Sequence, residues 1–202
     1  MSTDRRFVSR AGEKLDAALD AWEDVLPSLE GIVAADLGAN VGGFTDCLLT
    51  RGAKKVYAID TGYGVLDWSL RNDDRVVVME RTNALHAELP EPVDLVVVDV
   101  AWTPQRYILP AAWRMVRDPM WCPIVSLIKP QYEATESELG GRGKGRRGVL
   151  TDEQLPAVLE RIRADVRSVC GRIVREIDSP IRGSRGNAEF LWFILHAEDS
   201  KE

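Results

Sequence analysis

Short hydrophobic runs alternate with helical patterns along most of the chain. Apolar residues recur at helical spacing from Leu15 to Trp22, and Ser9 is of a type that caps helix starts, so we expect a first helix over about residues 9–24. Three further segments have helical patterns: Phe44–Arg51, Pro104–Val116 and Asp152–Val169. Seven apolar or β-branched runs are expected to be strands: Ile32–Leu37, Val56–Asp60, Val76–Met79, Leu95–Asp99, Ile124–Ile128, Arg172–Ile177 and Glu189–His196.

This alternation predicts an α/β fold. Strands that alternate with helices build a mostly parallel sheet with helices on both faces. The last two strands are joined only by the turn-rich Ser179–Asn187, which suits an antiparallel hairpin rather than a crossover. We therefore expect a seven-stranded, mostly parallel sheet with an antiparallel last strand. Because no repeat or long linker divides the chain, residues 1–202 are expected to form one domain.

Composition and charge narrow the class of protein. The net charge of −6 counts against a protein that coats nucleic acid non-specifically, although a local basic face is still compatible with it. Three scattered cysteines, Cys47, Cys122 and Cys170, and only two histidines argue against a disulfide framework and a zinc site. Because we recognise neither a signal peptide nor an apolar span, we expect a cytoplasmic protein with no metal and no membrane contact.

The most specific local motif follows the first expected strand. Asp36–Phe44 (DLGANVGGF) ends a strand in an acid, turns on glycines and begins a helix. In such sheets a ligand lies beyond the strand C-termini, and glycines let the backbone approach it closely. The spacing differs from the GxGxxG of dinucleotide sites, and the acid suits a cationic ligand such as the amino group of a methionine moiety. The alternative is a turn that only packs the helix on the sheet. The expected binding residues in this segment are Asp36, Gly38, Asn40, Gly42, Gly43 and Phe44.

Two polar residues follow the next two expected strands. Asp60 suits a ribose diol, which a carboxylate binds through two hydrogen bonds, and Asn83 suits the edge of an adenine. Together with Asp36, these groups match the three parts of S-adenosylmethionine, which is therefore the expected cofactor.

A lone lysine ends the fifth expected strand. Lys129 follows the apolar run Ile124–Ile128, and Asp99 ends the strand before it, so both should project over the same edge of the sheet. A charge in that position is costly unless it is paired or used. The sequence leaves open whether Lys129 forms a salt bridge with Asp99 or takes part in chemistry.

Several segments resemble, in the same order, the FtsJ-like methyltransferase family, and most closely its TlyA (haemolysin A) type. They are Ser9–Leu15 (SRAGEKL), Gly42–Asp46 (GGFTD), Arg51–Ala53 (RGA), Glu80–Asn83 (ERTN), Lys129–Glu133 (KPQYE), Ser179–Gly183 (SPIRG), Gly186–Asn187 and Glu189–Phe190. The resemblance spans about residues 7–196. It implies a Rossmann-like fold that binds S-adenosylmethionine and methylates a ribose 2′-hydroxyl of RNA, with ribosomal RNA as the expected substrate.

The resemblance also implies a Lys-Asp-Lys-Glu tetrad, which falls on Lys14, Asp99, Lys129 and Glu189. A ribose hydroxyl is a poor nucleophile at neutral pH, and Lys129 is our candidate for removing its proton. An ordinary lysine, with a pKa of about 10.4, must be tuned downward to act as a base, and burial beside a second lysine acts in that direction. The alternative is that Lys129 stays protonated and only orients the hydroxyl.

The sequence also departs from the TlyA type. That type carries a small RNA-binding domain ahead of the catalytic one, whereas this sequence starts almost at the catalytic helix. RNA is then expected to bind through the chain's own surface or with a partner protein. The candidate RNA contacts are Arg10, Trp102, Arg182 and Arg185. Trp102 suits stacking on an unpaired base, but core packing is the favoured interpretation.

A mobile, basic, glycine-rich loop is expected at about residues 134–150. It either closes on RNA phosphates or stays solvated.

Two other functions are compatible with the sequence. One is an enzyme of the same fold that methylates another RNA or a small molecule, which the acidic charge slightly favours. The other is a non-catalytic protein that binds S-adenosylmethionine and acts in assembly or regulation. The presence of all four tetrad positions argues against the second, because binding alone needs only Asp36, Asp60 and Asn83.

Overall fold

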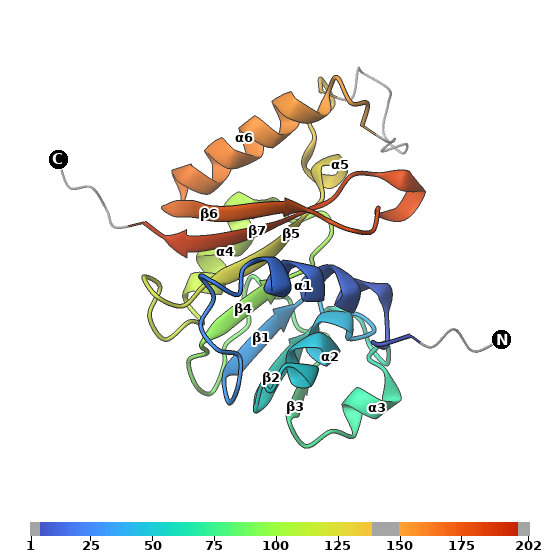
Figure 1. The fold of residues 1–202 in the computed structure, drawn as a ribbon, viewed down its shortest axis with the longest axis vertical. Helices are drawn as coiled ribbons and strands as arrows, with labels where there is room; N and C mark the ends of the chain where they lie inside the picture. Colours follow the sequence, from blue (N-terminus) through green and yellow to red (C-terminus); the bar gives the residue numbers. More distant parts are fainter. Residues whose placement is uncertain (1–4, 139–149, 198–202) are drawn as a thin grey trace.

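The computed structural model describes residues 5–138 and 150–197, which contain a seven-stranded sheet in the order β3-β2-β1-β4-β5-β7-β6 (Figure 1). The strands are β1 (Val33–Leu37), β2 (Lys55–Ile59), β3 (Val76–Met79), β4 (Leu95–Val98), β5 (Ile124–Ile128), β6 (Gly171–Asp178) and β7 (Phe190–His196). Strands β1 to β5 pair in parallel, and β7 is antiparallel to both β5 and β6. The predicted sheet and its antiparallel last strand are therefore confirmed.

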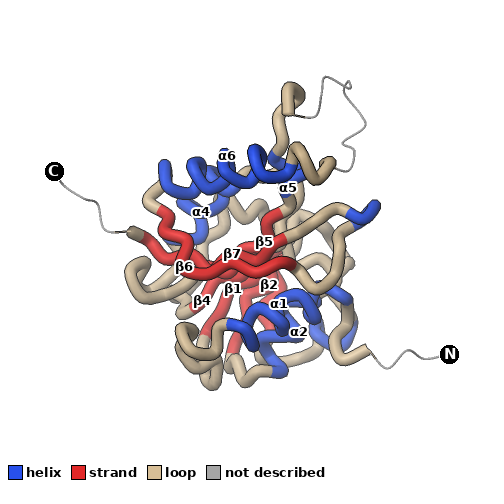
Figure 2. The backbone as a smooth tube through the Cα atoms, turned by 45° about the horizontal axis from the view of Figure 1, so that its top comes forward, coloured by secondary structure: helices blue, strands red, loops and turns tan. Residues whose placement is uncertain are grey.

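Helices cover both faces of the sheet, as predicted. They are α1 (Arg10–Ala21), α2 (Gly43–Thr50), α3 (Trp68–Arg71), α4 (Gln105–Trp113), α5 (Pro130–Glu133) and α6 (Leu155–Ser168). Figure 2 shows α1 and α2 on one side of the strands and α4, α5 and α6 on the other. The short helices α3 and α5 were not predicted, because four residues are too few to show a helical period. Among the described residues, no helix is long and apolar enough to cross a membrane.

Successive residues of the central strands contribute to two separate cores. Ala34 of β1 belongs to the same core as Leu15 of α1 and Phe44 of α2, whereas Ala35 belongs to the core that contains Ile108 of α4 and Ile162 of α6. All of these side chains are buried. A strand that is buried on both faces is apolar at nearly every position, which is why these strands appear in the sequence as hydrophobic runs, with Asp36 of β1 as an exception.

Helix α1 lies directly against the start of α2. A Cβ added to Gly12 would lie 2.8 Å from the carbonyl oxygen of Gly43, so only glycine allows this approach. Near the other end of α2, Arg51 Nε donates to Asp16 Oδ1 of α1 at 2.8 Å. These contacts hold α1, and with it Lys14, in a defined position over the sheet.

The predicted loop is described only in part. Ala134 to Glu138 form an irregular turn after α5, and the glycine-rich residues 139–149 lie outside the described residues.

Candidate active site

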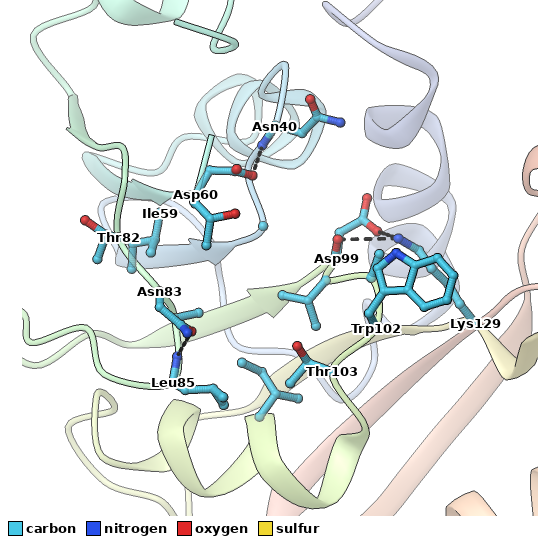
Figure 3. Close-up of a pocket in the computed structure, with 16 residues that line it drawn as sticks. Asn40, Ile59, Asp60, Thr82, Asn83, Leu85, Asp99, Trp102, Thr103 and Lys129 are labelled. Atoms are coloured by element: carbon cyan, nitrogen blue, oxygen red, sulfur yellow. Dashed lines mark hydrogen bonds and ion pairs between the residues drawn. The ribbon is translucent and has the colours of Figure 1, made fainter. Parts of the chain in front are cut away.

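A pocket of about 380 Å³ lies where the parallel strands of the sheet end (Figure 3). Figure 3 shows Asp60 and Asn83 at one end of this pocket and Asp99, Trp102 and Lys129 at the other. These five residues follow β2, β3, β4 and β5, so the sheet brings together side chains that are distant in the sequence. The pocket occupies the position at which open α/β sheets bind ligands.

Asp60 is held at the pocket by two backbone donors. Asn40 N donates to Asp60 Oδ2 at 2.8 Å, and Gly62 N donates to Oδ1 at 2.7 Å. Each carboxylate oxygen has a second lone pair, so both can still accept from a ligand hydroxyl. The expected two-point contact with a diol is therefore compatible with the geometry.

Asn83 presents its amide at the same end of the pocket. Its Oδ1 accepts from Leu85 N at 3.0 Å, which orients the side chain and leaves the NH₂ as the group able to donate to a ligand. Ile59, Ala84 and Ile108 line the pocket around it. Sequence reasoning missed these apolar residues, although Ala84 directly follows Asn83. A flat, apolar ring with acceptor atoms on its edge fits this environment.

The glycine turn brings the backbone of β1 against that of β4. Gly38 has φ +91°, and a Cβ there would lie 2.8 Å from the carbonyl oxygen of Asp99, so a larger residue is excluded on both grounds. Asn40 also has a positive φ of 49°, which asparagine tolerates better than most residues. Gly42 caps α2 with φ +103°, and Phe44 is buried in the first turn of that helix.

Asp36 is more deeply buried than a strand-end acid should be. It is fully buried inside β1, where Thr45 donates to its Oδ2 through both the backbone N at 2.9 Å and Oγ1 at 2.7 Å. Within the described chain no group donates to its Oδ1. Burial raises the pKa of Asp36 to about 7, although the Thr45 hydrogen bonds act in the opposite direction and the negative charge of Asp99 adds to the rise.

A small recess connects Asp36 with the glycine turn and α1. It has a volume of about 80 Å³, and Ser9, Gly38 and Asp99 are among the residues that line it. A buried carboxylate oxygen without a donor is costly, so a cationic group entering this recess would gain a partner there. The first turn of α1 was missed as part of the site.

Lys129 and Asp99 form an ion pair beside the pocket. Lys129 Nζ also lies 3.4 Å from the carbonyl oxygen of Asp99, and the two side chains are only 15% and 19% exposed. The salt bridge that the sequence left open is therefore present. Because the pair lines the pocket, a chemical role for Lys129 remains compatible with it.

A second lysine–carboxylate pair joins α1 to the residue that precedes β7. Lys14 Nζ of α1 donates to Glu189 Oε2 at 2.5 Å, and the side chains are 12% and 4% exposed. Strands β5 and β7 pair Ile128 with Phe190, so one further step of the antiparallel register sets Lys129 opposite Glu189. Strand pairing thus links the two ion pairs at one edge of the sheet.

The expectation that Trp102 packs in the core is wrong, whereas its predicted contact with RNA stays a prediction. Trp102 is not in the core: its side chain is 58% exposed, it lines the pocket, and its ring lies 4.6 Å from that of Tyr132. Arg10, Arg182 and Arg185 are exposed and are not among the residues that line the pocket. Arg182 Nη1 donates to the carbonyl oxygen of Gly186 at 3.1 Å.

Comparisons with known proteins agree with this geometry. The sequence profile described as FtsJ-like methyltransferase matches residues 7–194. The 16S/23S rRNA (cytidine-2′-O)-methyltransferase TlyA of Mycobacterium tuberculosis is 42% identical over 94% of this chain and 69% of that protein. Hemolysin A of Brachyspira hyodysenteriae is 38% identical over 92% of this chain and 75% of its own length.

Solved structures show the same arrangement of strands and helices. A presumed hemolysin from Streptococcus thermophilus superposes with a TM-score of 0.86 at 34% identity, covering 98% of this chain and 70% of that chain. Magnesium protoporphyrin IX methyltransferase from Synechocystis, solved with bound S-adenosylhomocysteine, shares the fold with a TM-score of 0.59 at 16% identity, over 98% of this chain and 88% of that one. The chain belongs to the FtsJ-like methyltransferase family, whose methyl donor is S-adenosylmethionine.

Proposed function

We propose that this chain methylates a ribose 2′-hydroxyl of ribosomal RNA and that Lys14, Asp99, Lys129 and Glu189 form its catalytic tetrad. The main support is geometric: the largely buried pair of Lys129 and Asp99 lines the cofactor pocket, and the strand register sets Glu189, which pairs with Lys14 of α1, opposite Lys129. The names of the TlyA relatives support the choice of ribosomal RNA and of the 2′-hydroxyl.

The residues present fit S-adenosylmethionine. The Asp36 carboxylate, with its unpartnered Oδ1, would hold the cationic amino group, Asp60 the ribose diol and Asn83 the adenine edge. When bound, the cofactor supplies a methyl group already activated by a sulfonium charge. The protein then has to align the hydroxyl with that methyl group and assist the loss of its proton.

Lys129 is the group we place nearest the hydroxyl. As a neutral amine it would accept the hydroxyl proton, and as an ammonium it would orient the oxygen. Asp99 fixes the amine through the ion pair, while Glu189 and Lys14 add one charge of each sign on the other side. In either role the reaction depends on Lys129.

Trp102 is proposed to stack on the base of the target nucleotide or of its neighbour. Its exposed ring borders the pocket next to Lys129 and packs against the ring of Tyr132. Base–aromatic stacking contributes about 1–3 kcal/mol per base and tolerates any sequence. Arg10, Arg182 and Arg185 are proposed to contact phosphates, and a partner protein could add specificity.

The test separates cofactor binding from transfer. Lys129→Ala should bind S-adenosylmethionine with nearly unchanged affinity by calorimetry, yet incorporate almost no tritiated methyl into ribosomal RNA. Lys54 is an exposed lysine just before β2, so Lys54→Ala is the matched control and should keep both properties. An active Lys129→Ala enzyme would remove this residue from the chemistry.

A second measurement tests the substrate. Mapping of 2′-O-methyl sites by mass spectrometry, in cells with and without the gene, should show at least one site lost from ribosomal RNA. Loss of methylation from another RNA, or from a small molecule alone, would contradict the choice of substrate. Binding of cofactor without any lost modification would instead favour a regulatory protein.

A further inference from the structure

An open groove of about 720 Å³ runs between α6 and the edge strand β6. Its lining includes four arginines and an apolar part formed by Ile173, Val174 and Ala197. Arg163 and Arg167 come from α6, and Arg172 and Arg175 from β6. None of the cofactor or tetrad residues lines this groove, so it is separate from the active site.

Two of the four arginine charges are already balanced. Arg163 Nη2 binds both oxygens of Glu176 at 2.9 Å, and Arg167 Nη2 binds Glu160 Oε1 at 2.8 Å. Arg175 Nη2 forms a longer ion pair with Asp24 Oδ2, at 3.7 Å.

The remaining positive charge is on β6. Arg172 is exposed, and no carboxylate in the described parts of the chain pairs with it. Arg172 and Arg175 therefore carry a net positive charge outward along this edge, on a molecule whose overall charge is −6. Exposed guanidinium groups beside an apolar lining suit a polyanion that also has flat, apolar parts.

The edge strand itself is poorly suited to pairing with another protein strand. The register of β6 with β7 shifts between Ile173 and Arg175, which marks a bulge. Bulges and charged side chains are devices by which proteins prevent strands from adding to a sheet edge. Nucleic acid is thus a better match for this surface than an extended peptide.

Strand β6 leads from the groove towards the edge of the sheet where the proposed tetrad lies. The strand runs from Gly171 to Asp178, a length of about 23 Å at a rise of about 3.3 Å per residue, and continues into the segment that carries Arg182, Arg185 and Glu189. A single RNA strand leaving the tetrad could therefore follow β6 into the groove.

We propose that the α6–β6 groove is a second RNA-binding surface. Through Arg172 and Arg175 it binds phosphates of the substrate strand that lie at a distance from the methylated nucleotide. The proposal rests on the proposed function for the identity of the RNA. The groove contributes to the affinity for RNA and not to the methyl-transfer step.

The test is the salt dependence of RNA binding. For single strands the logarithm of the binding constant falls by about 0.7 for each phosphate contact per decade of salt. Arg172→Ala/Arg175→Ala should therefore reduce the slope by about 1.4 and raise KM for a ribosomal RNA fragment, with kcat unchanged. Lys54→Ala/Arg117→Ala removes two exposed charges, one just before β2 and one between α4 and β5, and should leave the slope as it is.

The outcomes separate this proposal from the proposed function. If the protein transfers methyl groups, but RNA binding depends on salt with the same slope in the groove variant and in the wild type, the groove proposal alone is overturned. The groove would then be a surface for a protein partner. A protein that binds RNA with a groove-dependent slope but transfers no methyl group would support the groove and contradict the proposed function. A wild-type protein that binds no RNA would overturn both. Calorimetry with S-adenosylmethionine should give equal affinities for all variants, which confirms that each is folded.

Discussion

Replacing Asp36 with asparagine should stabilise the protein and weaken its binding of S-adenosylmethionine. The cause is the buried position of the carboxyl group inside β1, which raises its pKa from 3.8 to about 7. Because one pKa unit corresponds to 1.36 kcal/mol, the rise of about three units means that an ionised Asp36 costs about 4 kcal/mol of folding free energy above pH 7.

The sign of the effect on stability follows from the direction of the shift. A carboxyl group whose pKa is higher in the folded protein binds a proton more tightly there, so the protein without cofactor should lose stability as pH rises from about 4 to about 7. Asparagine has nearly the same shape and can still accept from Thr45, but it has no charge to desolvate. Asp36→Asn should therefore be more stable at pH 8, by up to about 4 kcal/mol, and should show little difference at pH 4.

Cofactor binding should show the opposite dependence. A cationic amino group pairs only with the ionised carboxylate, so the affinity of the wild type should rise up to tenfold per pH unit below about pH 7 and level off above it. Binding below pH 7 should release a proton. Asp36→Asn should bind weakly at every pH.

Two assays check this. Urea denaturation at pH 4 and pH 8 gives the stability of both proteins, and calorimetry in buffers of different ionisation enthalpy counts the released proton. If wild-type affinity is independent of pH, and Asp36→Asn binds equally well, Asp36 does not hold the amino group.

Three further predictions follow from contacts in the site. Gly38→Ala forces a Cβ towards the Asp99 carbonyl at φ +91° and should cost about 1–3 kcal/mol in thermal denaturation, with weaker cofactor binding; an unchanged melting temperature would contradict it. Lys14→Met leaves the buried Glu189 unpaired and should lower the free energy of unfolding by about 3–5 kcal/mol. The double variant Lys14→Met/Glu189→Gln should regain most of that stability but no methyl transfer. Recovery of activity in the double variant would exclude both residues from the tetrad. Burial raises the pKa of Glu133 to about 7, so Glu133→Gln should be more stable than wild type in urea at pH 8, with most of the difference lost at pH 4; equal stability at pH 8 would refute this.

The strands and long helices could be predicted because burial on both faces leaves a direct trace in the sequence. The start of β5 at Ile124 and its end at Ile128 were correct to the residue. Helix α1 ends at Ala21 and not near residue 24, because Trp22 already leaves the helical conformation. Helix ends depend on local hydrogen bonds that the hydrophobic pattern does not record.

Side-chain surroundings were harder to predict than positions. The sequence places Asp60 and Asn83 at strand ends, but not the backbone donors from Asn40, Gly62 and Leu85 that orient them. Lys14 and Glu189 are 175 positions apart, and only the family resemblance suggested that they belong together. Such pairings depend on tertiary packing, which no local spacing encodes.

The antiparallel pairing of β5 with β7 limits where this chain can tolerate changes in length. Side chains alternate between the two faces of a strand, so one residue inserted or deleted inside β7 would move all residues on one side of the change to the opposite face of the sheet, and the residues nearest Glu189 would lose their register with β5 if the rest of β7 kept it. Glu189 would then no longer stand opposite Lys129. Changes in length should therefore be tolerated least from Glu189 through β7, because a shift there would separate Glu189 from the two lysines of the proposed tetrad.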